Sequence, residues 1–282
     1  MTDPLGSYST NFGRFYSHPA SGVPRPTAFG AQVDDDPVRA AHPYSPKPSI
    51  TNIMKMLDKD FLPGYYARLV AEYAIPNLKA LQATAEKFGD DVAIGMLKAV
   101  PNAPNAAGAV GDEVHAAIEC HEKGREIPVL TTITAKRMFA QYLYFRAQRP
   151  MELIRSEFTV WSYTHGYAGT GDLMLNDQDG LWIVDAKSGN QVHPEVAMQN
   201  TAIQQADVIL NPEGNEFPMP EVNVLGVLHV RPMSVKLHRL YRTDEAWKAF
   251  LACKTLFDWK RFHYDHTIES EPFKTEKPKD EK

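Results

Sequence analysis

Three charged side chains in two neighbouring apolar runs are of the types that bind a divalent cation and activate water. Asp172 lies in the first run, and Asp185 and Lys187 end the second. Residues 176–180, between the runs, are rich in Asn, Asp and Gly, which tolerate left-handed backbone angles, so we expect a hairpin of two strands. Alternate residues of a strand share a face, which puts Asp185 and Lys187 on one side and Ala186 on the other. The hairpin can therefore bring two carboxylates and one ammonium into a compact site for a cation and an attacking water.

Simpler interpretations of the same residues stay open. An exposed ion pair at a strand end would also explain Asp185 and Lys187, although the apolar run before them puts the charges at the rim of a buried sheet, where desolvation is costly. Gly169 and Gly171, just before Asp172, let a backbone, a ligand or a metal approach closely. A phosphate-binding glycine loop is disfavoured, because this stretch opens a strand rather than a helix.

Three further residues are unremarkable one by one. His115 follows Gly111 by four positions on a predicted helix, beside its apolar face. A lone histidine there is commonly a core or surface residue, and the alternative is a metal ligand. Glu157 opens a predicted strand, and Gln199 lies in the helix that follows the Lys187 strand.

Taken in order, G-x-x-x-H, E, G-x-G-D, D-x-K and Q, the chain resembles the PD-(D/E)XK nuclease superfamily in its RecB-like exonuclease branch, over residues 49–262. Its opening helix and long helical insert are similar to those of members encoded by actinobacterial viruses. The resemblance implies that Asp172 and Asp185 are metal ligands and take part in catalysis, and that the Ala186 carbonyl is a further ligand. It also implies that Lys187 is the catalytic lysine and His115 an additional metal ligand.

The resemblance also implies the fold and the substrate contacts. The fold would be α/β, a restriction-endonuclease-like mixed sheet core with an N-terminal helical layer. Gln199 and Glu157 would contact the substrate. The family pattern continues Q-x-x-x-Y, but Ile203 stands where the Tyr would be, a departure that bears on strand positioning and DNA contact rather than on metal binding. Basic residues near the site are candidates for phosphate contacts, or else belong to an ordinary solvated face: Arg155 above all, with Lys136, Arg137, Arg146 and Arg149.

The function implied is a Mg²⁺- or Mn²⁺-dependent deoxyribonuclease, an exonuclease that hydrolyses phosphodiester bonds in viral DNA recombination, replication or repair. Carboxylate and carbonyl oxygens suit these cations. The cysteines of the iron–sulfur relatives are absent, so we expect no cluster. The partners would be DNA and a single-strand-binding or annealing protein.

Two other functions stay open. The net charge of -5 and Ile203 would suit a catalytically inactive nuclease-fold protein that binds DNA or a partner. Acidic charge would also suit a metal-dependent phosphatase or nucleotide hydrolase, because such an enzyme acts on a small substrate.

Composition sets the domain organisation. At 282 residues and 43% hydrophobic, we expect one domain over residues 49–265, preceded by a disordered or draped segment, 1–48, and followed by a disordered charged tail, 266–282. The two cysteines exclude a four-cysteine zinc or iron–sulfur site within this chain. No apolar run is long enough to cross a bilayer and no leader is evident, so we expect no membrane partner and a cytoplasmic location, in the host if the protein is viral.

Periodicity and turn residues predict the order of elements. Helices come first, then three strands, a helix, two strands and a closing helix. The expected helices cover residues 50–57, 63–74, 76–88, 90–100, 109–123, 135–148, 194–209 and 244–262. The expected strands cover residues 158–163, 167–175, 181–186, 222–230 and 235–241, with a long loop over 211–220.

Overall fold

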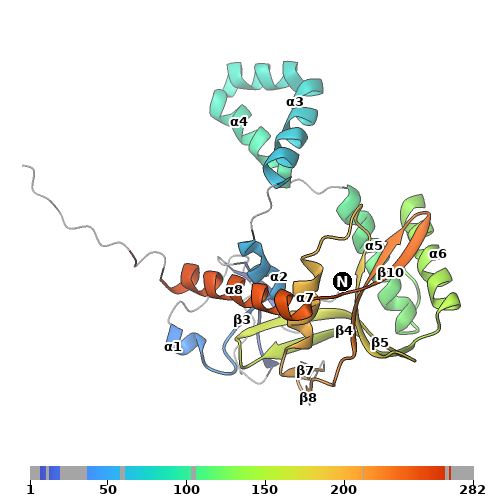
Figure 1. The fold of residues 1–282 in the computed structure, drawn as a ribbon. Helices are drawn as coiled ribbons and strands as arrows, with labels where there is room; N and C mark the ends of the chain where they lie inside the picture. The colour runs from blue at the N-terminus through green and yellow to red at the C-terminus, as the bar shows by residue number, and fades with distance from the viewer. Residues whose placement is uncertain are drawn as a thin grey trace, which may run out of the picture.

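A seven-stranded mixed sheet forms the centre of the computed structural model, which describes residues 7–10, 13–19, 37–57, 61–102, 106–211, 213–263 and 267 (Figure 1). Across the sheet the strands are β10 (Ser234–Arg239), β9 (Val224–Arg231), β6 (Gly180–Lys187), β5 (Tyr167–Asp177), β4 (Glu152–Ser162), β7 (Val208–Leu210) and β8 (Glu216–Pro218). Only the β6–β9 pair among these neighbours is parallel. A parallel pair needs a crossover connection, and α7 (Val196–Gln204) lies within it. The fold is therefore α/β.

Strands β4, β5 and β6 form the expected antiparallel meander. The hairpin of β5 and β6 pairs Leu173 with Val184 and Asp177 with Gly180. Gly180 has φ 98°, a left-handed angle that favours glycine. The apolar run of β9 is buried on both faces, as expected of an inner strand, and β10 pairs with it.

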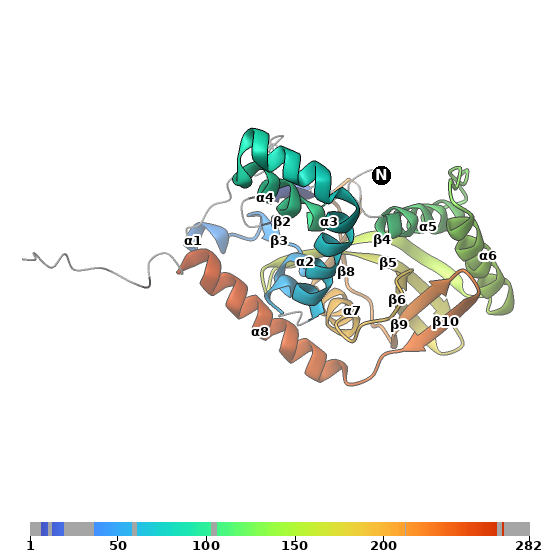
Figure 2. The same cartoon turned by 90° about the horizontal axis from the view of Figure 1, so that it is seen from above.

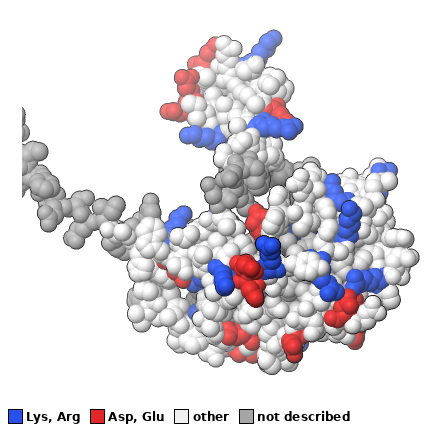
Figure 3. Space-filling view, viewed as in Figure 1, with Lys and Arg blue, Asp and Glu red and all other residues white. Residues whose placement is uncertain are grey.

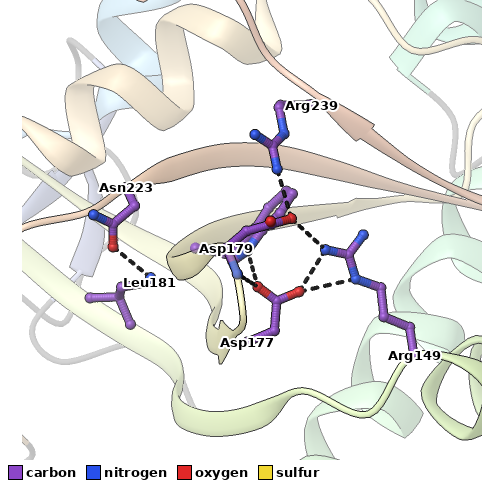
Figure 4. A network of polar contacts seen from close by, with 7 residues as sticks. Arg149, Asp177, Asp179, Leu181, Asn223 and Arg239 are labelled. Carbon is purple, nitrogen blue, oxygen red and sulfur yellow. Dashed lines mark hydrogen bonds and ion pairs between the residues drawn. The ribbon is translucent and has the colours of Figure 1, made fainter.

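Charged side chains fix the turn between β5 and β6 (Figure 4). Arg149 donates to Asp177 Oδ2 at 2.6 Å, and Arg239 donates to Asp179 Oδ2 at 2.8 Å. Trp182 Nε1 donates to Asp177 Oδ1 at 2.8 Å, while both guanidiniums lie 4.9 Å from the centre of the Trp182 ring. Arg149, a candidate for a phosphate contact, therefore binds the acidic side chains of this turn instead.

Helices cover both faces of the sheet (Figure 2). On one face α5 (Ala106–Glu122) and α6 (Ile133–Gln148) pack on a cluster that includes Leu173 and Leu175. On the other face, α7 packs with α2 (Ile50–Ile53) and α8 (Thr243–Phe262) on a cluster that includes Met174 and Ile183. The alternation of Leu173, Met174 and Leu175 between the two clusters is what a strand buried on both faces requires.

The expected helical layer takes a different form. In place of a layer on the sheet, α3 (Phe61–Phe88) and α4 (Asp90–Ala99) form a hairpin that stands apart from the sheet (Figure 1). Among its described side chains only Leu81 is buried. The expected break at Pro76 was wrong, because α3 continues through it as a single helix of 28 residues. Proline removes one backbone hydrogen bond and crowds the preceding turn, but residues that favour a helix, several alanines among them, lie on both sides of Pro76.

The described parts of residues 1–48 pack against the domain. Strands β1 (Ser7–Thr10), β2 (Gly13–Tyr16) and β3 (Lys47–Pro48) form a small sheet, and α1 (Pro37–Ala40) precedes β3. Phe15 belongs to the main core, where its ring lies 6.3 Å from that of Phe257. Apart from Thr267, the predicted tail lies outside the described residues. Within the part of the chain that the structure describes, no helix combines the length and apolar character needed to cross a membrane.

Candidate active site

The candidate site lies where the ladder between β5 and β6 opens. Their backbone pairing extends from Asp177–Gly180 to Leu173–Val184 and stops there, while β6 stays paired with β9 as far as Lys187. Beyond that point the carboxylate of Asp172 replaces the ladder, because its Oδ2 accepts from the backbone N–H of Ala186 at 2.8 Å. The N–H and C=O of one strand residue point to the same side, so the Ala186 carbonyl faces this opening too.

Asp185 is the most buried charged group of the site, with 2% of its side chain exposed. Its Oδ1 accepts from Lys187 Nζ at 3.0 Å and from Gln199 Nε2 at 2.9 Å. Its Oδ2 lies 2.8 Å from Lys187 Nζ as an ion pair, but the angles are not those of a hydrogen bond, so this buried oxygen has no hydrogen-bond donor among the described residues. Burial, followed by the charge of Asp172, raises the pKa of Asp185 to about 7.

Lys187 is held as a cation by its neighbours. Its burial opposes the charge, but the carboxylates of Asp185 and Asp172 outweigh that effect and raise the pKa of its ammonium. About a third of the side chain remains exposed, 38%, so Lys187 can reach a molecule outside the protein.

His115 meets the site from helix α5. Its Nδ1 lies 3.8 Å from Asp172 Oδ2. One helical turn earlier, Gly111 lies so close to the chain beyond β6 that an added Cβ would come within 2.9 Å of Ser188 Oγ. The glycine of the G-x-x-x-H pattern therefore lets α5 approach the end of β6, and the histidine lies one turn along the same face.

The two glycines before Asp172 have a packing role. A Cβ on Gly171 would lie 2.4 Å from the Phe158 ring, and one on Gly169 would lie 2.4 Å from Ile50 Cδ1. We expected room for a backbone, ligand or metal, but side chains of the protein fill it. Phe158 and Ile50 thereby hold β5 in place next to Asp172.

Glu157 lies beside the metal-ligating candidates in an unusual backbone conformation. Its φ is 47°, in the left-handed region where non-glycine residues are uncommon. Burial, and then the charges of Asp172 and Glu119, raise the pKa of Glu157 to about 8. Burial and these neighbouring charges therefore favour the neutral carboxylic acid form of Glu157 in the metal-free protein.

Other predicted contacts lie elsewhere. The Arg155 guanidinium lies 5.2 Å from the centre of the Phe217 ring, at the β8 side of the sheet. Arg146 is paired at 2.9 Å with the buried Glu122, which also accepts a hydrogen bond from Tyr142. Arg146 therefore serves the packing of α5 and α6.

Ile203 is buried in the core, so the position of the family Tyr is a packing position here. On the face that Figure 3 shows, acidic and basic side chains are interspersed over the sheet domain and the helical hairpin.

The donor set fits a hard divalent cation. Asp172 and Asp185 supply carboxylate oxygens, Asp185 Oδ2 is buried without a donor, and the Ala186 carbonyl faces the same opening. His115 supplies a nitrogen. In the described part of the chain, no three His, Cys, Asp or Glu side chains are already arranged around a common point. Binding would therefore require the side chains to turn toward the ion.

Sequence reasoning missed the residues that lie next to Lys187 on a pocket wall. Thr51 and Lys55, with His193 opposite, line this pocket. No local pattern marks them, because they come from α2, from the 3₁₀ turn that follows it and from the segment after β6, which meet only in the fold. Compared with models of protein families and with curated proteins, the chain matches none.

Proposed function

We propose that the protein is a Mg²⁺- or Mn²⁺-dependent deoxyribonuclease with a restriction-endonuclease-like core, an exonuclease that acts in viral DNA recombination, replication or repair. The observation that carries the proposal is the convergence of Asp172, Asp185, Lys187 and His115 at the opening between β5 and β6. The resemblance of their order to that of PD-(D/E)XK nucleases supports it from the sequence.

In this mechanism Asp172, Asp185, the Ala186 carbonyl and His115 would hold the cation. When bound, such a cation lowers the pKa of a water ligand and offsets charge on a phosphate. Lys187 Nζ stays protonated, so it can donate to the attacking water or to a phosphate oxygen and oppose the negative charge that develops in the transition state. Gln199 orients Asp185 through its hydrogen bond to Oδ1.

The test is cleavage of linear and circular DNA with Mg²⁺ or Mn²⁺. We expect cleavage of linear DNA, and a loss of about 10²-fold or more in rate for Lys187→Ala, because one preorganised donor typically contributes that much. Lys254→Ala is the matched control, because Lys254 also pairs with an aspartate, Asp258, but on α8. The proposal fails if neither DNA is cut with either cation, or if both variants cut equally well.

A catalytically inactive nuclease-fold protein that binds DNA or a partner is the second candidate. The absence of a preformed cluster of three ligands among the described side chains favours it. This alternative predicts DNA binding without turnover, and binding that Asp185→Ala does not change.

A further inference from the structure

A pocket of about 280 Å³ opens beside the candidate site. One wall comes from α2, from the 3₁₀ turn η2 (Met54–Met56) and from Leu57, and the opposite wall comes from the chain after β6 and the start of α7. Besides Lys187 and Gln199, the lining residues are Thr51, Met54, Lys55, Leu57, Gln191, His193, Glu195 and Val196.

The position of the pocket ties it to the reaction. Lys187 and Gln199 line the pocket and are also the two side chains that donate to Asp185 Oδ1. A group bound in the pocket therefore lies directly beside the atoms at which hydrolysis would occur. Because the pocket shares Lys187 and Gln199 with the candidate site, its occupant would be part of the substrate.

The lining indicates the kind of occupant. Met54, Leu57 and Val196 provide apolar surface for a flat ring, while Thr51 and Gln191 provide hydrogen-bonding groups. Small-molecule sites typically measure roughly 300–1,000 Å³, so this pocket suits one nucleotide-sized unit rather than a stacked base pair. Bases of single strands are commonly held in this way, unstacked and against side chains.

We propose that this pocket accepts one unstacked nucleotide next to the scissile phosphate, and so selects single strands or frayed ends as substrates. The inference rests on the proposed nuclease function. A base inside a duplex must first be unpaired and unstacked, at a cost of a few kcal/mol that a free strand does not incur. The pocket would thus set the substrate class, while the opening between β5 and β6 supplies the chemistry.

The test compares the hydrolysis of two chromogenic phosphodiesters by the wild-type protein with Mn²⁺. One is thymidine 5′-(4-nitrophenyl phosphate), which carries a nucleoside, and the other is bis(4-nitrophenyl) phosphate, which carries none. Thr51→Trp adds bulk at an exposed lining position. We expect it to raise KM for the nucleoside ester, and for a single-stranded oligonucleotide, by tenfold or more, with little change for the other ester.

Gln191→Trp fills the pocket from the opposite wall and should give the same result if the Thr51 variant folds poorly. Thr255→Trp, at an exposed position of α8, is the matched control and should behave as wild type. If both pocket variants cleave all three substrates like wild type, the inference is wrong and the nuclease proposal stands. If the wild-type protein cleaves none of the three, the nuclease proposal fails and the inference falls with it.

Discussion

At the scale of single residues, Asp185 lowers the stability of the metal-free protein but offers an oxygen that could bind a cation. One of its oxygens is paired twice, while the other is buried without a hydrogen-bond donor among the described groups. A buried charge that lacks part of its hydrogen bonding is expensive unless a ligand completes it. The same atom that costs stability in the metal-free protein would therefore gain most from a bound cation.

Asp185→Asn should abolish the effect of Mn²⁺ on stability. For the wild-type protein, Mn²⁺ at about 100 times its Kd should add about 2.7 kcal/mol to the free energy of unfolding, because the ion binds only the folded state. The variant lacks the ligand charge, so we expect no rise in Tm on adding Mn²⁺. Asp258→Asn, whose carboxylate pairs with Lys254 on α8, is the control and should keep the wild-type rise. An equal rise in Asp185→Asn would contradict the assignment.

Lys47 gives a pH prediction away from this site. Its buried Nζ donates to the carbonyls of Ala40 and His42 and to Ser45 Oγ. Burial, assisted by the charges of Lys254 and Arg261, lowers the pKa of Lys47 from 10.5 to about 8. Between about pH 8 and 10.5 the unfolded chain therefore holds a proton that the folded chain has lost, so the contribution of Lys47 to stability rises with pH.

Urea unfolding at pH 7.5 and pH 10 measures this effect against Lys47→Met, whose side chain does not titrate. We expect the wild-type free energy of unfolding, relative to the variant, to increase by about 1–3 kcal/mol over that range. Other titrating groups cancel in the difference. A difference that stays constant or falls would show that Lys47 is not desolvated as described.

Residue types and spacing predicted which side chains meet at the candidate site, but not the partners of the nearby arginines. Asp172 lies beside Asp185 and Lys187, as strand alternation and the hairpin predict. His115 lies near Asp172, as the resemblance implies. Arg146 and Arg149 look equally free in the sequence. Their roles depend on acidic partners that only the tertiary fold brings near, namely Glu122 for Arg146 and Asp177 for Arg149.

At the scale of elements, the site depends on how β5 is positioned between β4 and β6. The ladder between β5 and β6 ends at Leu173, the residue next to Asp172. The Phe158 ring on β4 occupies the space that a side chain on Gly171 would need. The glycine therefore keeps β5 close to β4 at the point where it separates from β6. Any residue larger than glycine must displace the ring or the strand.

Gly171→Ala should destabilise the protein by about 1–3 kcal/mol, the usual cost of overpacking. It should also lower DNA cleavage, because Asp172 is the next residue. Gly95→Ala is the matched control, since its new Cβ meets nothing within 4 Å in α4 and alanine favours a helix. Denaturant unfolding together with a cleavage assay tests both, and a Gly171 variant as stable and active as Gly95→Ala would contradict this account.

The sequence predicted long elements better than short ones. Strands β5 and β6 and helices α5, α6 and α8 were predicted within a few residues, because their hydrophobic periods are long and clear. The start of β4 was wrong, because the strand begins at Glu152, and Glu157 lies within it rather than at its start. The predicted helix over residues 194–209 ends at Gln204, and Val208–Leu210 instead form β7, paired with β4. The predicted loop contains β8. A strand of three residues is too short to show a hydrophobic period, so pairing with a neighbouring strand determines whether it forms.

At the scale of the whole molecule, the chain divides between a sheet domain and the α3–α4 hairpin. The two helices contact chiefly each other and the 3₁₀ turn η3 (Val100–Asn102). Large apolar side chains on the hairpin remain exposed, with Ile75 at 71% and Leu78 and Phe88 at 61%. The sheet domain, by contrast, has a continuous core on each face of its sheet. Its stability should therefore not depend on the hairpin.

Replacing residues 61–102 with a flexible Gly-Ser linker tests this independence. The tryptophans report on the sheet domain alone, because Trp161, Trp182, Trp247 and Trp259 all lie outside the hairpin. We expect the tryptophan-detected free energy of unfolding to change by less than about 1 kcal/mol, since few buried apolar contacts are removed. A lower m-value in urea would not be informative here, because a shorter chain exposes less surface on unfolding. A fall of several kcal/mol in the free energy itself would mean that the hairpin packs on the domain in solution, and the two would then have to be treated as one cooperative unit.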